Sequence, residues 1–295
     1  MLPFGNKEPT VFFGSGPVAA ECLTLLLAHT PIEAVVTKPR PAHHKGDVPV
    51  LAVAEAHSLP VITARTSHEL EHAITSQNFK SRYAILIDFG IIVNRTSIDT
   101  FPLGIINSHF SLLPQLRGAD PITWAIANGD KKTGVSIMCI DEGMDTGKLL
   151  GYRTLHIDEH ETAPQLTTRL ITLSDDLLRH YLPPYLTGQL QPKNQPHPSR
   201  ATYSRKLTKQ DGIIDPTKSA LQLEREVRAF IGWPQSRTTL GSIDVIVTSA
   251  HVSTHASSLS IQCGDGNYLV IDTLKPVGKK EMPAEAFLAG YKHRI

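Results

Sequence analysis

The chain has 295 residues, of which 41% are hydrophobic and 19% are charged, and its formal net charge is +1. This balance excludes a disordered or fibrous protein and provides enough residues for two ordinary domains or one large one. It contains no apolar run of about 18 residues, no signal-peptide pattern over residues 1–10 and only three scattered cysteines, so we expect a cytoplasmic protein without disulfides.

Strand and helix patterns alternate along the first part of the chain. Short apolar runs that are typical of buried strands occur at residues 10–13, 32–37, 61–62, 83–87 and 135–140. Segments that are typical of helices occur at residues 18–28, 49–57, 67–76, 121–128 and 162–181. The alternation predicts a Rossmann-like α/β domain over residues 1–186, with a parallel sheet covered by helices on both faces.

The pattern changes after this domain. Prolines gather between residues 183 and 198, which indicates a linker over residues 187–203. A helix pattern at 221–230 is then followed by short strand patterns at 237–240, 243–248, 259–263 and 268–274. Short strands separated by glycine turns predict a small OB-like β-barrel domain over residues 204–295.

Two local patterns invite other interpretations. Gly14-Ser15-Gly16 follows the first strand pattern, but position 19 is Ala and no acidic residue ends the second strand pattern, which argues against NAD binding. The start of the following helix remains a place where an anion can bind. His156–Glu161 contains metal-ligand residue types, but we interpret it as a solvated loop and expect no metal.

The densest cluster of chemically active residues follows the apolar pair Ile105-Ile106. In a strand that begins there, Asn107 and His109 lie on the same face. Asp145 follows later in the chain. An amide that binds an oxyanion, an imidazole that moves protons and a carboxylate that orients the imidazole together suit acyl transfer. Burying Asn107 and His109 without partners would cost about 1–3 kcal/mol each, so they require partners or a ligand.

These residues stand in motifs that resemble those of the folate-dependent formyltransferases. The motifs are, in order, Asn107-Ser108-His109, Ser111–Pro114, Arg117-Gly118 and Asp145-Thr146-Gly147. The resemblance extends from about Phe12 to Gly290. It implies 10-formyltetrahydrofolate as the formyl donor, Asn107, His109 and Asp145 as catalytic residues, and no metal.

The same resemblance implies a folate pocket and leaves the formyl acceptor open. The residues implied in the pocket are Ser111, Leu112, Leu113, Pro114, Phe89, Gly90 and Ile91. In this family the acceptor is the amine of a purine precursor, an amino sugar or the methionine on initiator tRNA. The segments Tyr203–Lys209, Trp233-Pro234 and Lys275–Met282 resemble those of methionyl-tRNA formyltransferases.

The expected function is therefore transfer of a formyl group to the α-amine of methionyl-initiator tRNA, by a monomer. A sugar-nucleotide N-formyltransferase that uses the same donor and the same three catalytic residues is the alternative. Residues 191–295 contain 14 lysines and arginines against 9 acidic residues, which agrees with a polyanionic partner. We expect tRNA contacts at Arg40, Lys45, Lys206, Lys209, Lys279 and Lys280.

Two segments depart from the family pattern. The basic loop at residues 38–48 is short, and Phe89 stands where the family has a tyrosine. Neither departure touches the three predicted catalytic residues.

Overall fold

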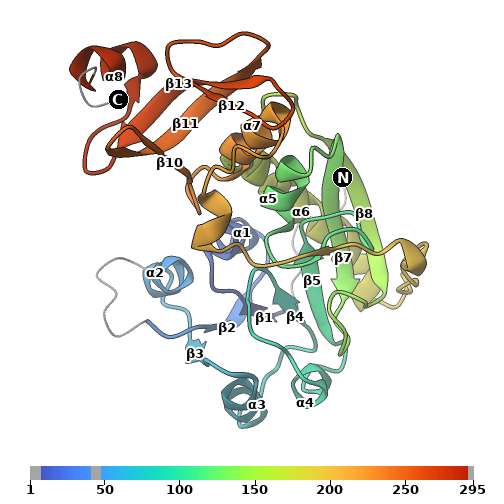
Figure 1. Cartoon of the computed structure of the whole chain (residues 1–295). Coiled ribbons are helices and arrows are strands. Elements are labelled where there is room, and N and C mark those ends of the chain that lie inside the picture. The colour runs from blue at the N-terminus through green and yellow to red at the C-terminus, as the bar shows by residue number, and fades with distance from the viewer. Residues whose placement is uncertain (1–7, 41–47, 292–295) are drawn as a thin grey trace. The chain divides into compact units, whose positions relative to one another are not determined.

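The structure, a computed structural model, describes residues 8–40 and 48–291 (Figure 1). The chain divides into two compact units. The first contains residues 1–118, 134–155 and 168–203, and the second contains residues 119–133, 156–167 and 204–295. The domain limits expected at residues 186 and 204 stay a prediction, and Lys45 lies outside the described residues.

The first unit is built on a seven-stranded sheet with the order β3-β2-β1-β4-β5-β7-β8. The pairings from β3 to β5 are parallel, whereas β7 runs antiparallel to β5. The predicted parallel sheet is confirmed, and β8 is an addition that the sequence patterns did not indicate. The strands are β1 (Thr10–Phe13), β2 (Ile32–Thr37), β3 (Val61–Thr63), β4 (Ala84–Leu86), β5 (Ile105–His109), β7 (Lys132–Cys139) and β8 (Leu149–His156).

The helices before the linker differ from the predicted ones at two places. α4 was not predicted, although the Asn94 side chain caps it by accepting a hydrogen bond from Ser97 N at 3.0 Å. α6 continues through Pro183 and Pro184 instead of ending at Tyr181. The helices are α1 (Pro17–Leu26), α2 (Pro49–Ala56), α3 (Ser67–Thr75), α4 (Arg95–Asp99), α5 (Pro121–Ala127) and α6 (Ala163–Leu186). Within the described ranges, no helix is long and apolar enough to cross a membrane.

The start of α1 already has an anionic neighbour from the protein itself. A Cβ atom added at Gly16 would lie 1.9 Å from Oδ2 of Asp88, so the carboxylate packs directly against the backbone there. Ser15 N also donates to the backbone carbonyl of Asp88 at 3.0 Å. An anion at this helix terminus would therefore meet the negative charge of the Asp88 carboxylate.

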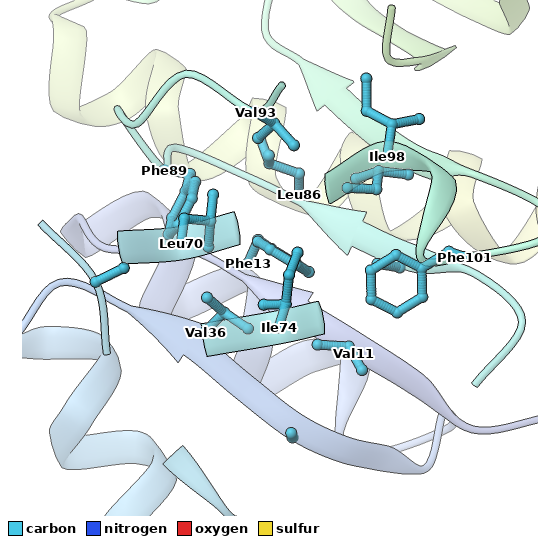
Figure 2. Packing of buried hydrophobic residues seen from close by; sticks show 14 residues of the cluster. Val11, Phe13, Val36, Leu70, Ile74, Leu86, Phe89, Val93, Ile98 and Phe101 are labelled. Carbon is cyan, nitrogen blue, oxygen red and sulfur yellow. The ribbon is translucent and has the colours of Figure 1, made fainter. Parts of the chain in front are cut away.

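One face of the sheet packs against α3 and α4 through an apolar cluster. Figure 2 shows Phe13 of β1 in the middle of this cluster, between Leu70 and Ile74 of α3 and Phe101, which follows α4. The Phe13 ring meets the rings of Phe89 and Phe101 edge-on, at centroid distances of 5.4 and 6.0 Å. This packing fixes β1 and the loop after β4. The order of the strands in the sheet reverses between β1 and β4.

The second unit contains a five-stranded antiparallel sheet, an open half-barrel that confirms the predicted small β domain. Its core lies between this sheet and α7, where Leu223 and Val227 join Val245, Val247 and Leu269. The strands are β10 (Ser236–Leu240), β11 (Ile243–Ser253), β12 (Ser260–Gln262), β13 (Tyr268–Pro276) and β14 (Met282–Pro283). The helices are α7 (Ala220–Ala229) and α8 (Ala284–Tyr291), and neither α8 nor β14 was predicted.

The Phe13 cluster gives a stability prediction for the first unit. Phe13→Ala should lower the free energy of unfolding by about 3–5 kcal/mol, because it removes a fully buried ring and leaves a cavity. Urea denaturation followed by circular dichroism measures the effect. Ile92→Ala, at a side chain that is 79% exposed, is the control and should change stability by less than about 0.5 kcal/mol. Equal effects of the two substitutions would contradict the assigned core.

Candidate active site

β5 has polar side chains at its carboxyl end, and two of them share one face of the sheet. Asn107 and His109 lie two residues apart, and both are buried. The strand lies between β4 and β7, with Asn107 opposite Met138 and His109 opposite Ser136. The strand expected from Ile105 is present, and its period of two places both side chains on one face of the sheet.

Asp145 lies beside both side chains, in the loop that joins β7 to β8. Its Oδ1 accepts a hydrogen bond from Asn107 Nδ2 at 3.4 Å, and its Oδ2 accepts one from Gly118 N at 2.7 Å. The Nδ1 atom of His109 is 3.7 Å from Oδ2, an ion-pair distance that is too long for a hydrogen bond. The structure therefore brings the three predicted catalytic residues together, although Asp145 is distant from Asn107 and His109 in the sequence.

The surroundings of His109 determine which of its nitrogens carries the proton. Nε2 lies 2.9 Å from the backbone carbonyl oxygen of Leu116. Because a carbonyl oxygen only accepts, Nε2 is the protonated nitrogen of the neutral ring. Nδ1 is then the nitrogen that can take up a proton, and it faces the carboxylate of Asp145. A proton taken up at Nδ1 would be stabilised by that carboxylate.

The two residues whose oxygen atoms lie beside the nitrogens of His109 have left-handed backbone conformations. Leu116 and Asp145 each have φ of 51°, in the left-handed region that residues other than glycine rarely adopt. Such conformations cost about 1–3 kcal/mol each and persist only where surrounding contacts hold them. Two of the left-handed non-glycine residues of the described chain thus lie beside the imidazole nitrogens.

The Ser111–Pro114 turn is anchored to β7 through the buried hydroxyl of Ser136. This hydroxyl donates to Ser111 O at 2.7 Å and accepts from Leu113 N at 3.1 Å. The hydroxyl of Ser111 itself donates to Gln115 O at 2.6 Å, and Leu113 packs against Met138. Among the predicted folate-binding residues of this turn, only Leu112 keeps a partly exposed side chain.

The second predicted folate segment, Phe89–Ile91, lies at the carboxyl ends of β1 and β4. The sheet order reverses there, which is where parallel α/β sheets open a crevice for ligands. The Phe89 side chain points into the apolar cluster and its carbonyl accepts from the Ser15 hydroxyl at 3.1 Å. Gly90, with φ of 65°, and the neighbouring Ile92 are exposed. The ring of Phe89 therefore supports the loop from inside.

Sequence reasoning missed a residue from the predicted linker that contacts this site. The amide of Gln195, which is 7% exposed, donates from Nε2 to the backbone carbonyls of Asp145 at 2.7 Å and Gly147 at 3.0 Å. Its Oε1 accepts from the buried guanidinium of Arg117 at 2.7 Å. The composition of the linker gave no sign of this role, because a glutamine between polar residues and prolines is typical of exposed chain.

The predicted tRNA-binding lysines of the second unit are exposed. Lys206, Lys209, Lys279 and Lys280 all lie at the surface, and none of their ammonium groups has a carboxylate partner among the described residues. By contrast, Arg205 pairs with Asp211 and lowers the pKa of that carboxyl. Arg40 is also exposed, at the end of the described part of its loop.

Two further basic residues, Arg237 and Lys275, were not predicted. Arg237 of β10 lies opposite Ile246 of β11, and Ile246 lies opposite Lys275 of β13. The three side chains therefore share one face of the sheet. Val245 and Val247 point to the opposite face, into the core. Arg237 also donates to the backbone carbonyl of Lys209, which brings this row next to the predicted lysines.

One cysteine, Cys139, lies at the end of β7, before the loop that carries Asp145. Burial raises the pKa of the Cys139 thiol, which donates a 3.7 Å hydrogen bond to the Tyr185 hydroxyl. In the part of the chain that the structure describes, no group of three or more His, Cys, Asp or Glu side chains is placed to hold a metal ion.

Comparisons with known proteins identify the family. Residues 19–182 match the formyl transferase family and residues 206–292 match the formyl transferase C-terminal domain. A methionyl-tRNA formyltransferase from Myxococcus xanthus is 34% identical over 97% of this chain and 96% of its own length. A methionyl-tRNA formyltransferase from Roseiflexus castenholzii is 33% identical over 96% of both chains. The chain belongs to the methionyl-tRNA formyltransferase family.

Solved structures share the fold at lower identity. An N-formyltransferase from Helicobacter canadensis, in complex with folinic acid and dTDP-3-aminofucose, superposes with a TM-score of 0.66. It is 19% identical and matches 90% of this chain and 99% of its own. HypX from Aquifex aeolicus, in complex with tetrahydrofolic acid, gives a TM-score of 0.66 at 13% identity over 96% of this chain and 47% of its own. The chain therefore shares the fold of these two structures.

Gly147, the glycine of the Asp145-Thr146-Gly147 motif, gives a prediction for the loop that carries the Asp145 carboxylate. A Cβ atom at Gly147 would lie 1.8 Å from the backbone oxygen of Cys139, so Gly147→Ala must push the loop away from β7. We expect it to lower formyl transfer by at least about tenfold and to lower the melting temperature. Gly290→Ala is the control, since no atom lies within 4 Å of its added Cβ, and it should leave both unchanged or raise stability slightly. Full activity of Gly147→Ala would show that the loop tolerates displacement.

Proposed function

We propose that this protein transfers a formyl group from 10-formyltetrahydrofolate to the α-amine of methionine esterified to initiator tRNA. The observation that carries the proposal is the meeting of Asn107, His109 and Asp145 at the end of β5. The match to curated methionyl-tRNA formyltransferases over nearly the whole chain supports the choice of acceptor. The exposed basic residues of the second unit support a polyanionic partner.

The role of Asn107 follows from its two amide N–H bonds. One donates to Asp145 Oδ1, so the side chain has a fixed orientation. The other can donate to the oxyanion that forms when the amine attacks the formyl carbon. Removing one such donor in acyl-transfer enzymes costs about 2.7–4 kcal/mol of transition-state stabilisation.

His109 and Asp145 manage the proton that the attacking amine loses. A free α-amine titrates near pH 7.7–8.0, about where proteins work, so a useful fraction is neutral and can attack. The positive nitrogen of the tetrahedral intermediate must then release a proton before the folate N10 leaves. Nδ1 of His109 accepts it, directly or through a water, and the Asp145 carboxylate stabilises the imidazolium. The proton then passes to N10 as the bond between the formyl carbon and N10 breaks, so the folate leaves as a neutral amine and His109 returns to its neutral form.

We place the folate donor at the carboxyl ends of β1 and β4, where the order of the sheet reverses. The backbone of Gly90 and Ile91, and the side chain of Leu112 in the turn after β5, are exposed or half-buried. They offer hydrogen-bonding backbone and an apolar wall to a pterin ring. Phe89, Ser111, Leu113 and Pro114 hold these segments in place from inside the protein.

The tRNA contacts proposed for the second unit are phosphate contacts. The lysines at 206, 209, 279 and 280 are exposed and without carboxylate partners in the described residues, so their charge is available to a polyanion. Arg237 and Lys275 extend this basic surface over the outer face of the sheet. Such contacts position a nucleic acid without selecting its sequence.

The catalytic assignment predicts the kinetics of three variants. His109→Ala and Asn107→Ala should each lower kcat by about 100-fold or more, because each removes a contact to the transition state or its proton. Asp145→Asn should preserve the fold but lower kcat and change the pH–rate profile, because an amide does not stabilise the imidazolium. Steady-state kinetics and circular dichroism measure these effects. Wild-type turnover in any of the three variants would contradict its assigned role.

The acceptor is tested by offering charged initiator tRNA and a nucleotide amino sugar side by side. We expect formylation of the tRNA, and formylation of the sugar alone would establish the alternative. A variant with Lys206, Lys209, Lys279 and Lys280 changed to Gln should raise KM for every charged tRNA. Its affinity should also depend less steeply on salt, with a log–log slope that is smaller by about 0.9 for each phosphate that is no longer neutralised, as on duplex DNA.

The control for the lysine variant is binding of the folate donor, which should be unchanged because the proposed crevice contains none of these lysines. An unaltered KM for tRNA together with an unaltered salt slope would contradict a tRNA platform at these residues.

A further inference from the structure

The segment predicted as a linker contributes a buried side chain to the candidate active site. The two N–H bonds of the Gln195 amide are both donated to backbone carbonyls of the loop that carries the catalytic carboxylate, those of Asp145 and Gly147. Its oxygen accepts from the guanidinium of Arg117. A side chain that is 7% exposed and satisfied on both sides of its amide is fixed in one orientation.

These hydrogen bonds act on a strained turn. Asp145 has φ of 51°, a conformation that a non-glycine residue keeps only when its neighbours hold it. Gln195 holds the carbonyl of this residue and that of Gly147, two positions later, so it fixes the peptide group that follows Asp145 and the one that follows Gly147. The direction of the Asp145 carboxylate, toward Asn107 and His109, depends on that turn.

Arg117 closes the arrangement into a ring of contacts. Its guanidinium holds Gln195, and the next residue, Gly118, donates its backbone N–H to Oδ2 of Asp145 at 2.7 Å. The Asp145 carboxylate is thus bound directly by the backbone N–H of Gly118. The Asp145 backbone carbonyl is connected to Arg117 through Gln195, which binds both.

The same segment also holds the residue that orients His109. Thr202 accepts from Leu116 N through its hydroxyl at 2.9 Å, and its backbone carbonyl accepts from Arg117 N at 2.9 Å. Leu116 in turn provides the carbonyl that accepts from Nε2 of His109. Residues 195–202 therefore contact the supports of both His109 and Asp145.

We propose that Gln195 is a positioning residue for Asp145, and that the segment from 195 to 202 is part of the active site. This inference rests on the catalytic role of Asp145 in the proposed function. Gln195 touches no substrate in this role. It holds the turn in which the carboxylate meets Asn107 and His109.

Gln195→Glu tests the donor side of the amide in the full-length protein. The substitution keeps an oxygen for Arg117 but replaces the group that faces the two carbonyls with a second oxygen, which repels them. We expect kcat for the accepted substrate to fall by about 10- to 100-fold, with KM for the formyl donor changed less than about twofold. Gln195→Ala, which introduces no charge, should also lower kcat. It replaces Gln195→Glu in the test if that variant does not fold.

The matched control is Gln191→Glu, at an exposed glutamine of the predicted linker, residues 187–203. It makes the same chemical change and should leave kcat and KM at their wild-type values. A similar fall in kcat for Gln191→Glu would attribute the effect to added negative charge and overturn the proposal.

A double-mutant cycle separates positioning from general support of the fold. In the Asp145→Asn background, Gln195→Glu should lower kcat less than about twofold further, because the carboxylate that it positions is already gone. A full additional loss in that background would show that Gln195 acts independently of Asp145 and would overturn the proposal. The pH–rate profile of Gln195→Glu should shift in the same direction as that of Asp145→Asn.

A crystal structure of Gln195→Glu gives a readout that does not depend on turnover. We expect Asp145 to leave the left-handed region or its Oδ2 to lose the hydrogen bond from Gly118 N. Retention of both features would overturn the proposal. Wild-type kcat of Gln195→Glu together with an impaired Asp145→Asn variant would overturn this inference alone, whereas wild-type kcat of Asp145→Asn would contradict the proposed function.

Discussion

Three consecutive polar side chains, Asn107, Ser108 and His109, are buried at the end of a central strand, and each needs a partner. Leaving one of them unsatisfied would cost about 1–3 kcal/mol. Asn107 donates to Asp145, the Ser108 hydroxyl shares a 2.6 Å hydrogen bond with Ser174, and His109 donates to Leu116 O. The partners come from three different parts of the chain, so this one requirement ties α6, the loop after β5 and the β7–β8 loop to the same strand.

The partners that meet His109 are held in strained conformations, and the surrounding chain supplies the contacts that hold them. Leu116 and Asp145 both have left-handed backbones. Thr202 binds the backbone N–H of Leu116, and Gln195 binds the backbone carbonyl of Asp145. A flexible tether would not supply this support, because ordering its residues costs about 1–2 kcal/mol each in backbone entropy. The burial of Gln195 and its three hydrogen bonds offset that cost locally.

The sequence was sufficient for the parts of the site that depend on local periodicity. Alternation along β5 predicts that Asn107 and His109 share a face, and the motif resemblance adds Asp145. The approach of Asp145 depends on the β7–β8 hairpin, and β8 escaped prediction because Tyr152, Arg153 and Thr154 are exposed and carry no apolar alternation. Gln195 could not be predicted, since its burial depends on the fold of residues far from it in sequence.

The distribution of charge is consistent with a division of labour between the two parts of the chain. Residues 1–190 contain 15 basic and 19 acidic residues, a net of −4, whereas residues 191–295 carry a net of +5. At physiological ionic strength charges are screened over about 8 Å, so only unpaired exposed groups close to a phosphate contribute to binding. Arg205 and Arg228 are neutralised by Asp211 and Glu224. The exposed lysines at 206, 209, 279 and 280, which have no carboxylate partner among the described residues, are therefore the charges of the second unit that remain available to a polyanion.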